Sequence, residues 1–274
     1  MKMTRLHLFL AVIFPLVVFS GQPAVAQDAP VFSRLEIDFS KADPEYFTIN
    51  PASIRVTLLG TSEEQDTSYV KMQEPARPLA DILVSIEKIV NIAEKLWKIV
   101  EANKPVVNIE SKYAVAYPEG VTAASQMSSW SRPKVYSYAF YAENLYGSVM
   151  INAKYKVAYS YNGAYKGKGK YLTAVAVIPT RAEVGFGYKF YMSATVPDST
   201  ITNTGTTADP VAAMQLKLSW WMATALKVMD GTSVYFIQGD GVCEEIASPW
   251  SKPVQIKVED LKSAAPLLNA VKVF

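Results

Sequence analysis

The chain has 274 residues, of which 50% are hydrophobic, 12% are aromatic and 19% are charged, and its formal net charge is +2. This composition excludes an intrinsically disordered protein, a collagen and a small disulfide-rich protein. The only uninterrupted apolar run lies at the N-terminus, so the sequence offers no internal transmembrane helix.

Residues 1–26 have the pattern of a cleaved secretion signal. Lys2 and Arg5 precede an apolar stretch over 6–19, and Ala24-Val25-Ala26 supplies the small residues that a signal peptidase accepts. A short membrane anchor is the alternative, but the apolar stretch is short for a membrane span. We therefore expect cleavage after Ala26 and a secreted or periplasmic protein.

Removal of this leader narrows the chemistry that is open to the chain. Without Lys2 and Arg5, the 27 basic residues fall to 25, equal to the 25 acidic residues, and His7, the only histidine, is also lost. A neutral chain argues against nucleic acid as a partner. A chain without histidine has no Ser-His-Asp or Cys-His catalysis and no His-ligated metal site. We therefore predict a non-enzymatic protein with no catalytic residue, cofactor or metal, and only a hydrolase that uses two carboxylates stays open.

The remaining reactive residues do not form a recognisable site. Cys243 is the only cysteine, which excludes an intramolecular disulfide and favours an inert buried thiol over an intermolecular link. Glu63-Glu64 and Glu244-Glu245 are adjacent acids, whose side chains point to opposite faces of a strand. Gly239-Asp240-Gly241 lacks the acid spacing of a calcium loop and predicts a turn.

Alternation of apolar and polar residues predicts a mainly β protein. The predicted strands are 34–39, 54–58, 135–141, 148–161, 165–178, 184–196 and 234–238. Residues 197–209 are expected to form a loop. Residues 210–229 are expected to begin as a strand, and their second half to form either more strand or a short helix. Gly185 and Gly187, on one face of the 184–196 stripe, indicate the close approach of another segment or ring.

One long amphipathic α-helix is predicted over 78–104. Its apolar residues recur at spacings of three and four from Leu79 to Val100, and Pro78 suits the first turn. A membrane-surface helix is the alternative, but the segment is slightly acidic, whereas interfacial helices are normally rich in Lys and Arg. We therefore expect an antiparallel β-sandwich-like domain with this helix packed on it.

The expected organisation is a single β-rich domain over 27–274. Its parts are acidic N-terminal strands over 27–76, the helix over 78–104, a tyrosine-rich β core over 108–260 and a C-terminal tail over 261–274.

The most informative region is 113–191, which holds 13 of the 16 tyrosines. Between Glu143 and Glu183 there is no acidic residue, whereas five lysines and one arginine lie there. Asn162-Gly163 predicts a two-residue hairpin turn. The resulting register places Lys166, Lys168 and Lys170 opposite Tyr159, Val157 and Tyr155 on a hairpin that projects from the body.

We predict that this hairpin binds a ligand through its rings and ammonium groups. The predicted site residues are Tyr155, Tyr159, Tyr161, Tyr165, Lys166, Lys168, Lys170 and Tyr171. Rings stack on sugars, and ammonium groups meet phosphate or carboxylate, so the expected partner is an anionic glycan, a lipid headgroup or an envelope protein. The alternative is that the lysines only keep a sheet edge from aggregating.

Three functions therefore stay open. The first is an exported, non-enzymatic protein that binds an envelope ligand. The second is a membrane-active or pore-forming protein, against which the mixed Lys and Tyr face of the hairpin argues. The third is an outer-membrane barrel, which Pro266 and Lys272 in the last segment disfavour.

Overall fold

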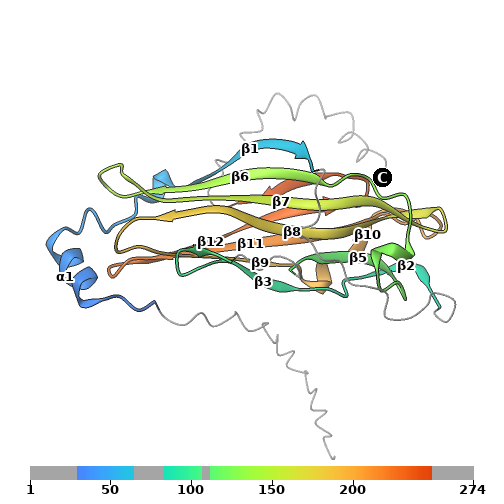
Figure 1. Ribbon diagram of the computed structural model, residues 1–274, viewed down its shortest axis with the longest axis horizontal. Coiled ribbons are helices and arrows are strands. Elements are labelled where there is room, and N and C mark those ends of the chain that lie inside the picture. The colour runs from blue at the N-terminus through green and yellow to red at the C-terminus, as the bar shows by residue number, and fades with distance from the viewer. Residues whose placement is uncertain (1–29, 65–82, 107–111, 249–274) are drawn as a thin grey trace, which may run out of the picture. The chain divides into compact units, whose positions relative to one another are not determined.

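The computed structural model describes residues 30–64, 83–106 and 112–248. The described residues from Phe32 onward belong to one compact unit. Its strands form two antiparallel sheets, one with the order β1-β6-β7-β8-β5-β2 and the other with the order β13-β12-β11-β9-β3-β4, to which β10 is added beside β11 (Figure 1). The prediction of a mainly β, antiparallel fold is confirmed.

The strands of the first sheet are β1 (Arg55–Glu63), β6 (Lys134–Glu143), β7 (Val149–Tyr165), β8 (Lys168–Val184), β5 (Ala114–Glu119) and β2 (Ser85–Val90). Those of the second are β13 (Cys243–Ala247), β12 (Val228–Gln238), β11 (Ala212–Ala223), β9 (Lys189–Thr195), β3 (Leu96–Glu101), β4 (Lys104–Pro105) and β10 (Thr202–Asn203). The described helical segments are α1 (Arg34–Ala42) and short 3-10 turns at Pro51–Ser53, Ala124–Gln126 and Asp198–Thr200. None of the helices in these ranges combines the length and the hydropathy that a membrane crossing requires.

The two sheets pack face to face through large aromatic side chains. The ring of Phe140 on β6 stacks on Phe190 of β9 and Trp220 of β11, with centroid distances of 5.2 and 5.4 Å. Farther along, the hydroxyl groups of Tyr155 on β7 and Tyr235 on β12 are 3.1 Å apart. The core therefore lies between the sheets, and its tyrosines form hydrogen bonds within it.

The predicted strand at 34–39 is wrong, because these residues form most of helix α1. Ser33 caps the helix: its hydroxyl accepts from the Glu36 amide at 3.2 Å, and the Glu36 carboxylate accepts from the Ser33 amide at 2.7 Å. This Ser-x-x-Glu capping box was readable in the sequence, but the local alternation of apolar residues favoured a strand. The helix buries Glu36 and Ser40 and exposes Leu35 and Phe39.

The predicted long helix over 78–104 is also wrong, because its described part forms β2, β3 and the first residue of β4. Residues 78–82 lie outside the described residues. A turn held by Asn91 separates the two strands, with its side chain bonded to the backbone of Ala93, Glu94 and Val115. The segment is rich in β-branched residues, and its apolar spacing also satisfies two short strands. Contacts with β5 and β9 decide in favour of the strands.

Most other predicted strands fall largely within β1, β6, β7, β8, β9 and β12. Residues 210–229 contain β11, a turn and the start of β12, so the short helix considered there does not form. The close approach predicted at the two glycines is confirmed, although they lie in the turn between β8 and β9. A Cβ on Gly185 would lie 2.2 Å from the Met150 side chain, and one on Gly187 would lie 2.2 Å from the Phe47 ring.

The predicted hairpin turn is wrong by four residues. Strands β7 and β8 continue past Asn162-Gly163, and the turn lies at Lys166-Gly167, both with positive φ, where Tyr165 pairs with Lys168. Asn162 has a φ of 62° in an irregular part of the β7–β8 ladder. Its backbone amide donates to the carbonyl of Gly239, in the turn that follows β12 of the second sheet, at 2.8 Å. The Asn-Gly pair therefore bends a strand against the opposite sheet, as a β-bulge does.

This placement predicts that Gly163→Ala destabilises the protein by about 1–3 kcal/mol, the usual cost of overpacking. A Cβ at Gly163 would lie 2.2 Å from the indole of Trp130, whose Nε1 donates to the Ala124 carbonyl at 3.1 Å. Urea unfolding measures the loss. Gly60→Ala is the matched control, because a Cβ there meets nothing within 4 Å.

A double-mutant cycle tests whether Gly163 packs against Trp130, as in this strand position, or lies in an exposed hairpin turn. In a Trp130→Ala background the Gly163→Ala cost should largely disappear, because the colliding ring is absent. An undiminished cost in that background would contradict the packing of Gly163 beneath Trp130.

Candidate functional site

The structure does not bring the predicted hairpin site together as a surface. Tyr155, Tyr159 and Tyr171 are buried, with exposures of 1% or less. The Tyr159 hydroxyl donates to the carbonyl of Gly241, and the Tyr171 hydroxyl donates to the carbonyl of Ile86, each at 2.8 Å. Burial raises the pKa of all three tyrosines well above the ordinary value. These three rings belong to the core and cannot stack on an external ligand.

The other predicted site residues lie at or near the surface. Lys166, Lys168 and Lys170 are exposed, whereas Tyr161 and Tyr165 are half-buried. The Lys134 ammonium lies 4.8 Å from the centre of the Tyr161 ring, and the Lys166 ammonium lies 5.4 Å from that of Tyr165. The hairpin tip is thus a basic strip whose nearest rings already contact lysines of this chain.

The residues considered for chemistry occupy ordinary positions. Cys243 is partly buried, and desolvation raises the pKa of its thiol to about 12, so the thiol stays protonated at neutral pH. Gly239-Asp240-Gly241 forms the expected turn, in which the Gly241 amide donates to the Gln238 carbonyl at 2.9 Å. The Ser233 hydroxyl donates to the carboxylate of Glu245 at 2.9 Å.

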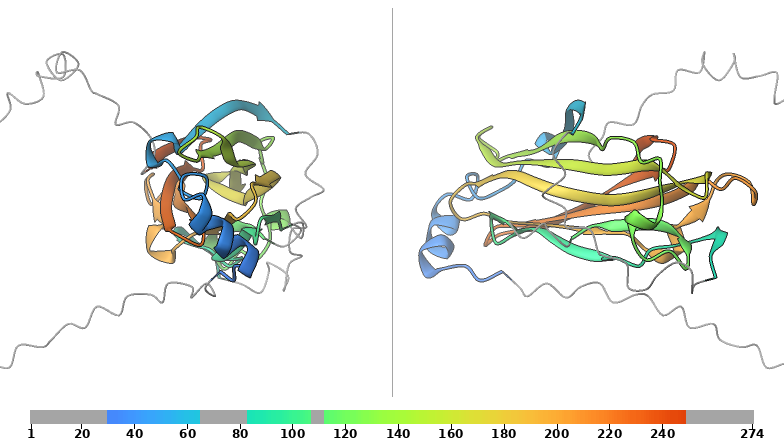
Figure 2. Two further views of the ribbon diagram at one scale, coloured as in Figure 1. Left: turned by 90° about the vertical axis from the view of Figure 1, so that its left-hand side faces the viewer. Right: turned by 45° about the vertical axis from the view of Figure 1, so that its right-hand side comes forward.

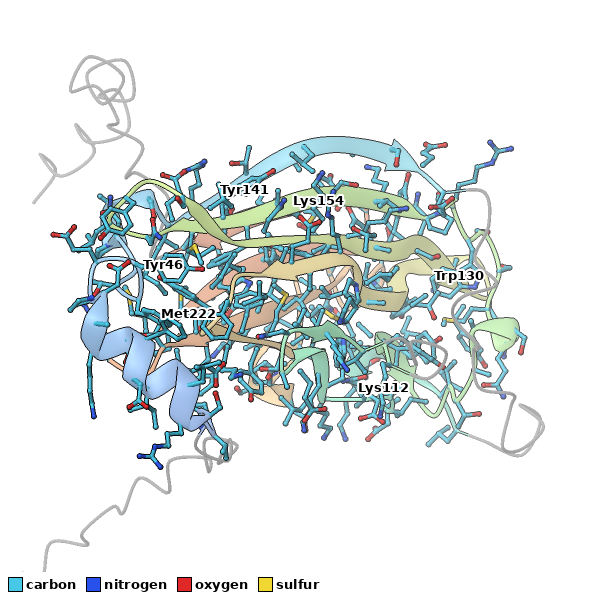
Figure 3. The ribbon with its side chains drawn as sticks, turned by 60° about the vertical axis from the view of Figure 1, so that its left-hand side comes forward. Tyr46, Lys112, Trp130, Tyr141, Lys154 and Met222 are labelled. Atoms are coloured by element: carbon cyan, nitrogen blue, oxygen red, sulfur yellow. The ribbon has the colours of Figure 1, made fainter. Side chains whose placement is uncertain are left out.

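An aromatic pocket that the sequence reasoning missed lies beside α1. It has a volume of about 250 Å³, and its lining residues are Phe39, Asp43, Tyr46, Phe47 and Phe186. Helix α1 carries Phe39, Asp43 caps its C-terminal end, and Phe186 comes from the turn between β8 and β9. In Figure 3, Tyr46 lies near α1, at the end of the sheets opposite Trp130.

The pocket rings meet at steep angles. Tyr46 and Phe47 have a centroid distance of 4.9 Å and an interplanar angle of 67°, and Phe47 and Phe186 a distance of 6.3 Å and an angle of 73°. Phe39 and Phe186 are nearly perpendicular, at 88° and 6.1 Å. A guest in this pocket would therefore contact ring faces and edges on more than one side.

Packing beneath the pocket fixes its floor. Phe47 is buried and stacks on Tyr188, whose hydroxyl donates to the carbonyl of Tyr46. Gly187 has a φ of +76° and leaves the space that the Phe47 ring fills. The floor is therefore preformed, whereas Phe39 and Phe186 are 51% and 50% exposed, so the mouth opens to solvent.

Among the described residues that line the pocket, Asp43 is the only charged one. Its Oδ1 accepts from the Tyr46 amide at 3.2 Å and from the Tyr146 hydroxyl at 2.8 Å. The hydrogen bond to Asp43 raises the pKa of Tyr146 to about 12, so that hydroxyl remains a donor at neutral pH. Within the described ranges, no lysine or arginine forms an ion pair with Asp43.

The sequence held only partial signals for this pocket. Four of its five residues lie between Phe39 and Phe47, an aromatic segment that follows the capping box. Phe186 is distant in sequence from the other four residues. The only signal near it was the glycine on each side, which predicted the close approach of another segment. Comparison with protein-family models, curated proteins and solved structures finds no match to this chain.

Proposed function

We propose that this chain is an exported, non-enzymatic β-sandwich protein that binds a small ligand in the aromatic pocket. The observation that carries the proposal is the preformed, open pocket with four rings and a single carboxylate. Ligand sites are typically concave and apolar, with a few polar groups that fix orientation. Among the described residues that line the pocket, Asp43 and Tyr46 carry the titratable groups and the other three are phenylalanines, a composition that suits binding of a ligand.

Two expectations from the sequence accompany this proposal: export of the protein, and binding of an anionic ligand at the hairpin. The leader pattern over 1–26 supports export, and those residues lie outside the described ranges. An anionic partner at Lys166, Lys168 and Lys170 stays a prediction. We favour the pocket because three rings of the predicted hairpin platform are buried, whereas the pocket rings line an open cavity.

The pocket function predicts saturable binding of at least one small probe. The probes are tetramethylammonium, methyl glucoside, benzyl alcohol and inorganic phosphate, each titrated while protein NMR signals are recorded. Phe186→Ala should weaken binding of the pocket probe by about tenfold, because one ring contact with a desolvated guest contributes roughly 1–2 kcal/mol.

Leu58→Ala is the matched control for this titration. Leu58 is exposed to 51%, like Phe186, but lies on β1 and does not line the pocket. Equal affinity in wild type and Phe186→Ala would overturn the pocket function, and so would the absence of binding by every probe. Phosphate binding that is lost on charge reversal of Lys166, Lys168 and Lys170 would place the ligand at the hairpin instead.

Action on membranes is a second candidate function. The α1 end of the sheets faces the viewer in the left view of Figure 2. Exposed apolar side chains at this end favour action on membranes. Turns that contact or adjoin α1 and the β8–β9 turn bring these side chains together. The apolar residues of this end include Leu35, Phe39, Leu145, Tyr146, Phe186, Leu226 and Val228, each at least 45% exposed. Dye release from liposomes, which ligand binding alone does not cause, separates this function from the first.

A further inference from the structure

The charges around the aromatic pocket favour a positively charged guest. The Asp43 carboxylate lies in the lining, and Asp43 also caps the C-terminal end of the nine-residue helix α1. A helix C-terminus carries a partial negative charge from its unpaired carbonyl groups. The carboxylate and the helix end thus add negative potential at the same place.

The nearby basic residues do not cancel this potential. The ammonium group of Lys189 is 3.0 Å from the Glu36 carboxylate and lies over the Phe32 ring, so it is already engaged by other groups. Lys41, in the last turn of α1, is exposed to solvent, where its charge is screened. Neither lysine lines the pocket.

The rings provide the second attraction. An aromatic face carries negative charge density, and a cation within about 6 Å of the ring centre is attracted to it, most strongly when it is desolvated. Phe186 lies at a steep angle to both Phe39 and Phe47, so one compact cation can contact more than one of these rings. Three aromatic rings and one carboxylate form an arrangement that binds alkylated ammonium groups.

Size and hydrogen-bonding capacity narrow the class further. The volume of about 250 Å³ lies below the roughly 300–1,000 Å³ of pockets for drug-sized ligands, so the bound group is small. A primary ammonium has three N–H donors to satisfy, whereas the described lining offers only the Asp43 carboxylate and the Tyr46 hydroxyl as side-chain acceptors. A neutral sugar also needs several polar partners. A fully alkylated ammonium needs no hydrogen bond and presents only apolar, positively charged surface.

We infer that the ligand of the aromatic pocket carries a quaternary ammonium group, held by the rings of Phe39, Phe47 and Phe186 and by the carboxylate of Asp43. This inference rests on the proposed pocket function and adds the chemical class of the ligand. The same group occurs in free choline and in phosphocholine lipids, and the experiment distinguishes these two sources.

The test compares choline with 3,3-dimethylbutan-1-ol, which has the same shape but carbon in place of the charged nitrogen. Choline should bind wild type at least about tenfold more tightly than its neutral analogue, in keeping with the strength of desolvated cation–π contacts. Asp43→Asn should remove most of this preference by weakening choline, while the affinity for the neutral analogue stays unchanged.

Tyr146→Phe is the matched control, because it removes the hydrogen bond to Asp43 and retains the carboxylate. It should preserve the preference for choline. Melting temperatures of all variants near that of wild type would show that the folded pocket is being compared. Sedimentation with phosphatidylcholine vesicles, competed by free choline, identifies a lipid source, and binding of free choline without vesicle binding identifies a soluble one.

The outcomes separate the two levels of the proposal. Equal affinity for choline and the neutral analogue, with both weakened by Phe186→Ala, overturns the ligand class and leaves the pocket function standing. Methyl glucoside binding in place of choline does the same. Choline binding that survives both Phe186→Ala and Asp43→Asn overturns the pocket as its site, and with it the proposed function.

Discussion

Raising the pH above 10 is expected to unfold the protein cooperatively. Seven tyrosines have a pKa well above 10, chiefly because they are buried. They are Tyr117, Tyr138, Tyr155, Tyr159, Tyr171, Tyr188 and Tyr235. These phenols stay protonated in the folded state and ionise near pH 10 in the unfolded state. Their contribution is therefore fully present below pH 10 and is lost as the pH rises above it.

The size of this effect follows from proton linkage. Each tyrosine that ionises only in the unfolded state lowers the free energy of unfolding by about 1.4 kcal/mol per pH unit above 10. Seven tyrosines together give about 10 kcal/mol per pH unit, against a typical total stability of about 5–15 kcal/mol. Unfolding is thus expected within about 1.5 pH units above 10. Circular dichroism and tyrosinate absorbance, followed together, measure it.

The pair Tyr155 and Tyr235 supplies the control. Their hydroxyl groups contact each other at 3.1 Å, so changing both to Phe removes a hydrogen bond without leaving a buried hydroxyl unpaired. The double variant should show a pH dependence that is shallower by about 2.7 kcal/mol per pH unit. Gradual ionisation of all the tyrosines, the seven buried ones included, with unchanged circular dichroism would contradict the burial of these seven.

Phe140→Ala is expected to lower the free energy of unfolding by about 3–5 kcal/mol, the range for truncation of a buried aromatic side chain. Phe140 has no exposed surface, and its ring joins the sheets by stacking on Phe190 and Trp220. Truncation removes these contacts and leaves a cavity between two sheets that cannot easily collapse. Urea unfolding measures the loss.

Phe186→Ala is the natural comparison for Phe140→Ala, because it removes the same side chain from a half-exposed position at the pocket. Its cost should be well under half that of Phe140→Ala, since less apolar surface returns to water. Equal costs for the two variants would show that the interface between the sheets is not the main core. A small cost for Phe186→Ala also permits its use in the ligand titrations.

Local sequence patterns misplaced two elements for an identifiable reason. The apolar spacing of 82–100 satisfies both one helix and two strands, and pairing with β5 and β9 is a non-local choice. In 34–39 the alternation competed with a capping box, and the helix forms with its polar residues Glu36 and Ser40 buried. Prediction from a hydrophobic pattern assumes that apolar residues face the core. Helix α1 is an exception, because it exposes Leu35 and Phe39.

The hairpin and its tyrosines show how register changes a functional interpretation. With the turn at Asn162-Gly163, Lys166 pairs with Tyr159 and a mixed surface results. With the turn at Lys166-Gly167, Tyr159 faces the opposite sheet, and the lysines lie at the tip. Because side chains alternate between sheet faces, the position of one turn decides which residues meet a ligand.

The sequence by itself determined the mainly β class, most strand positions and the close approaches at Gly185 and Gly187, because alternation and glycine placement are local signals. Only the tertiary structure decided that the tyrosines form a core and that Phe39, Asp43, Tyr46, Phe47 and Phe186 line one pocket. Phe186 reaches the other four through the pairing of β8 and β9 with their neighbours, which brings the turn between them beside α1. Such a contact depends on sheet register over more than a hundred residues, and no local pattern encodes it.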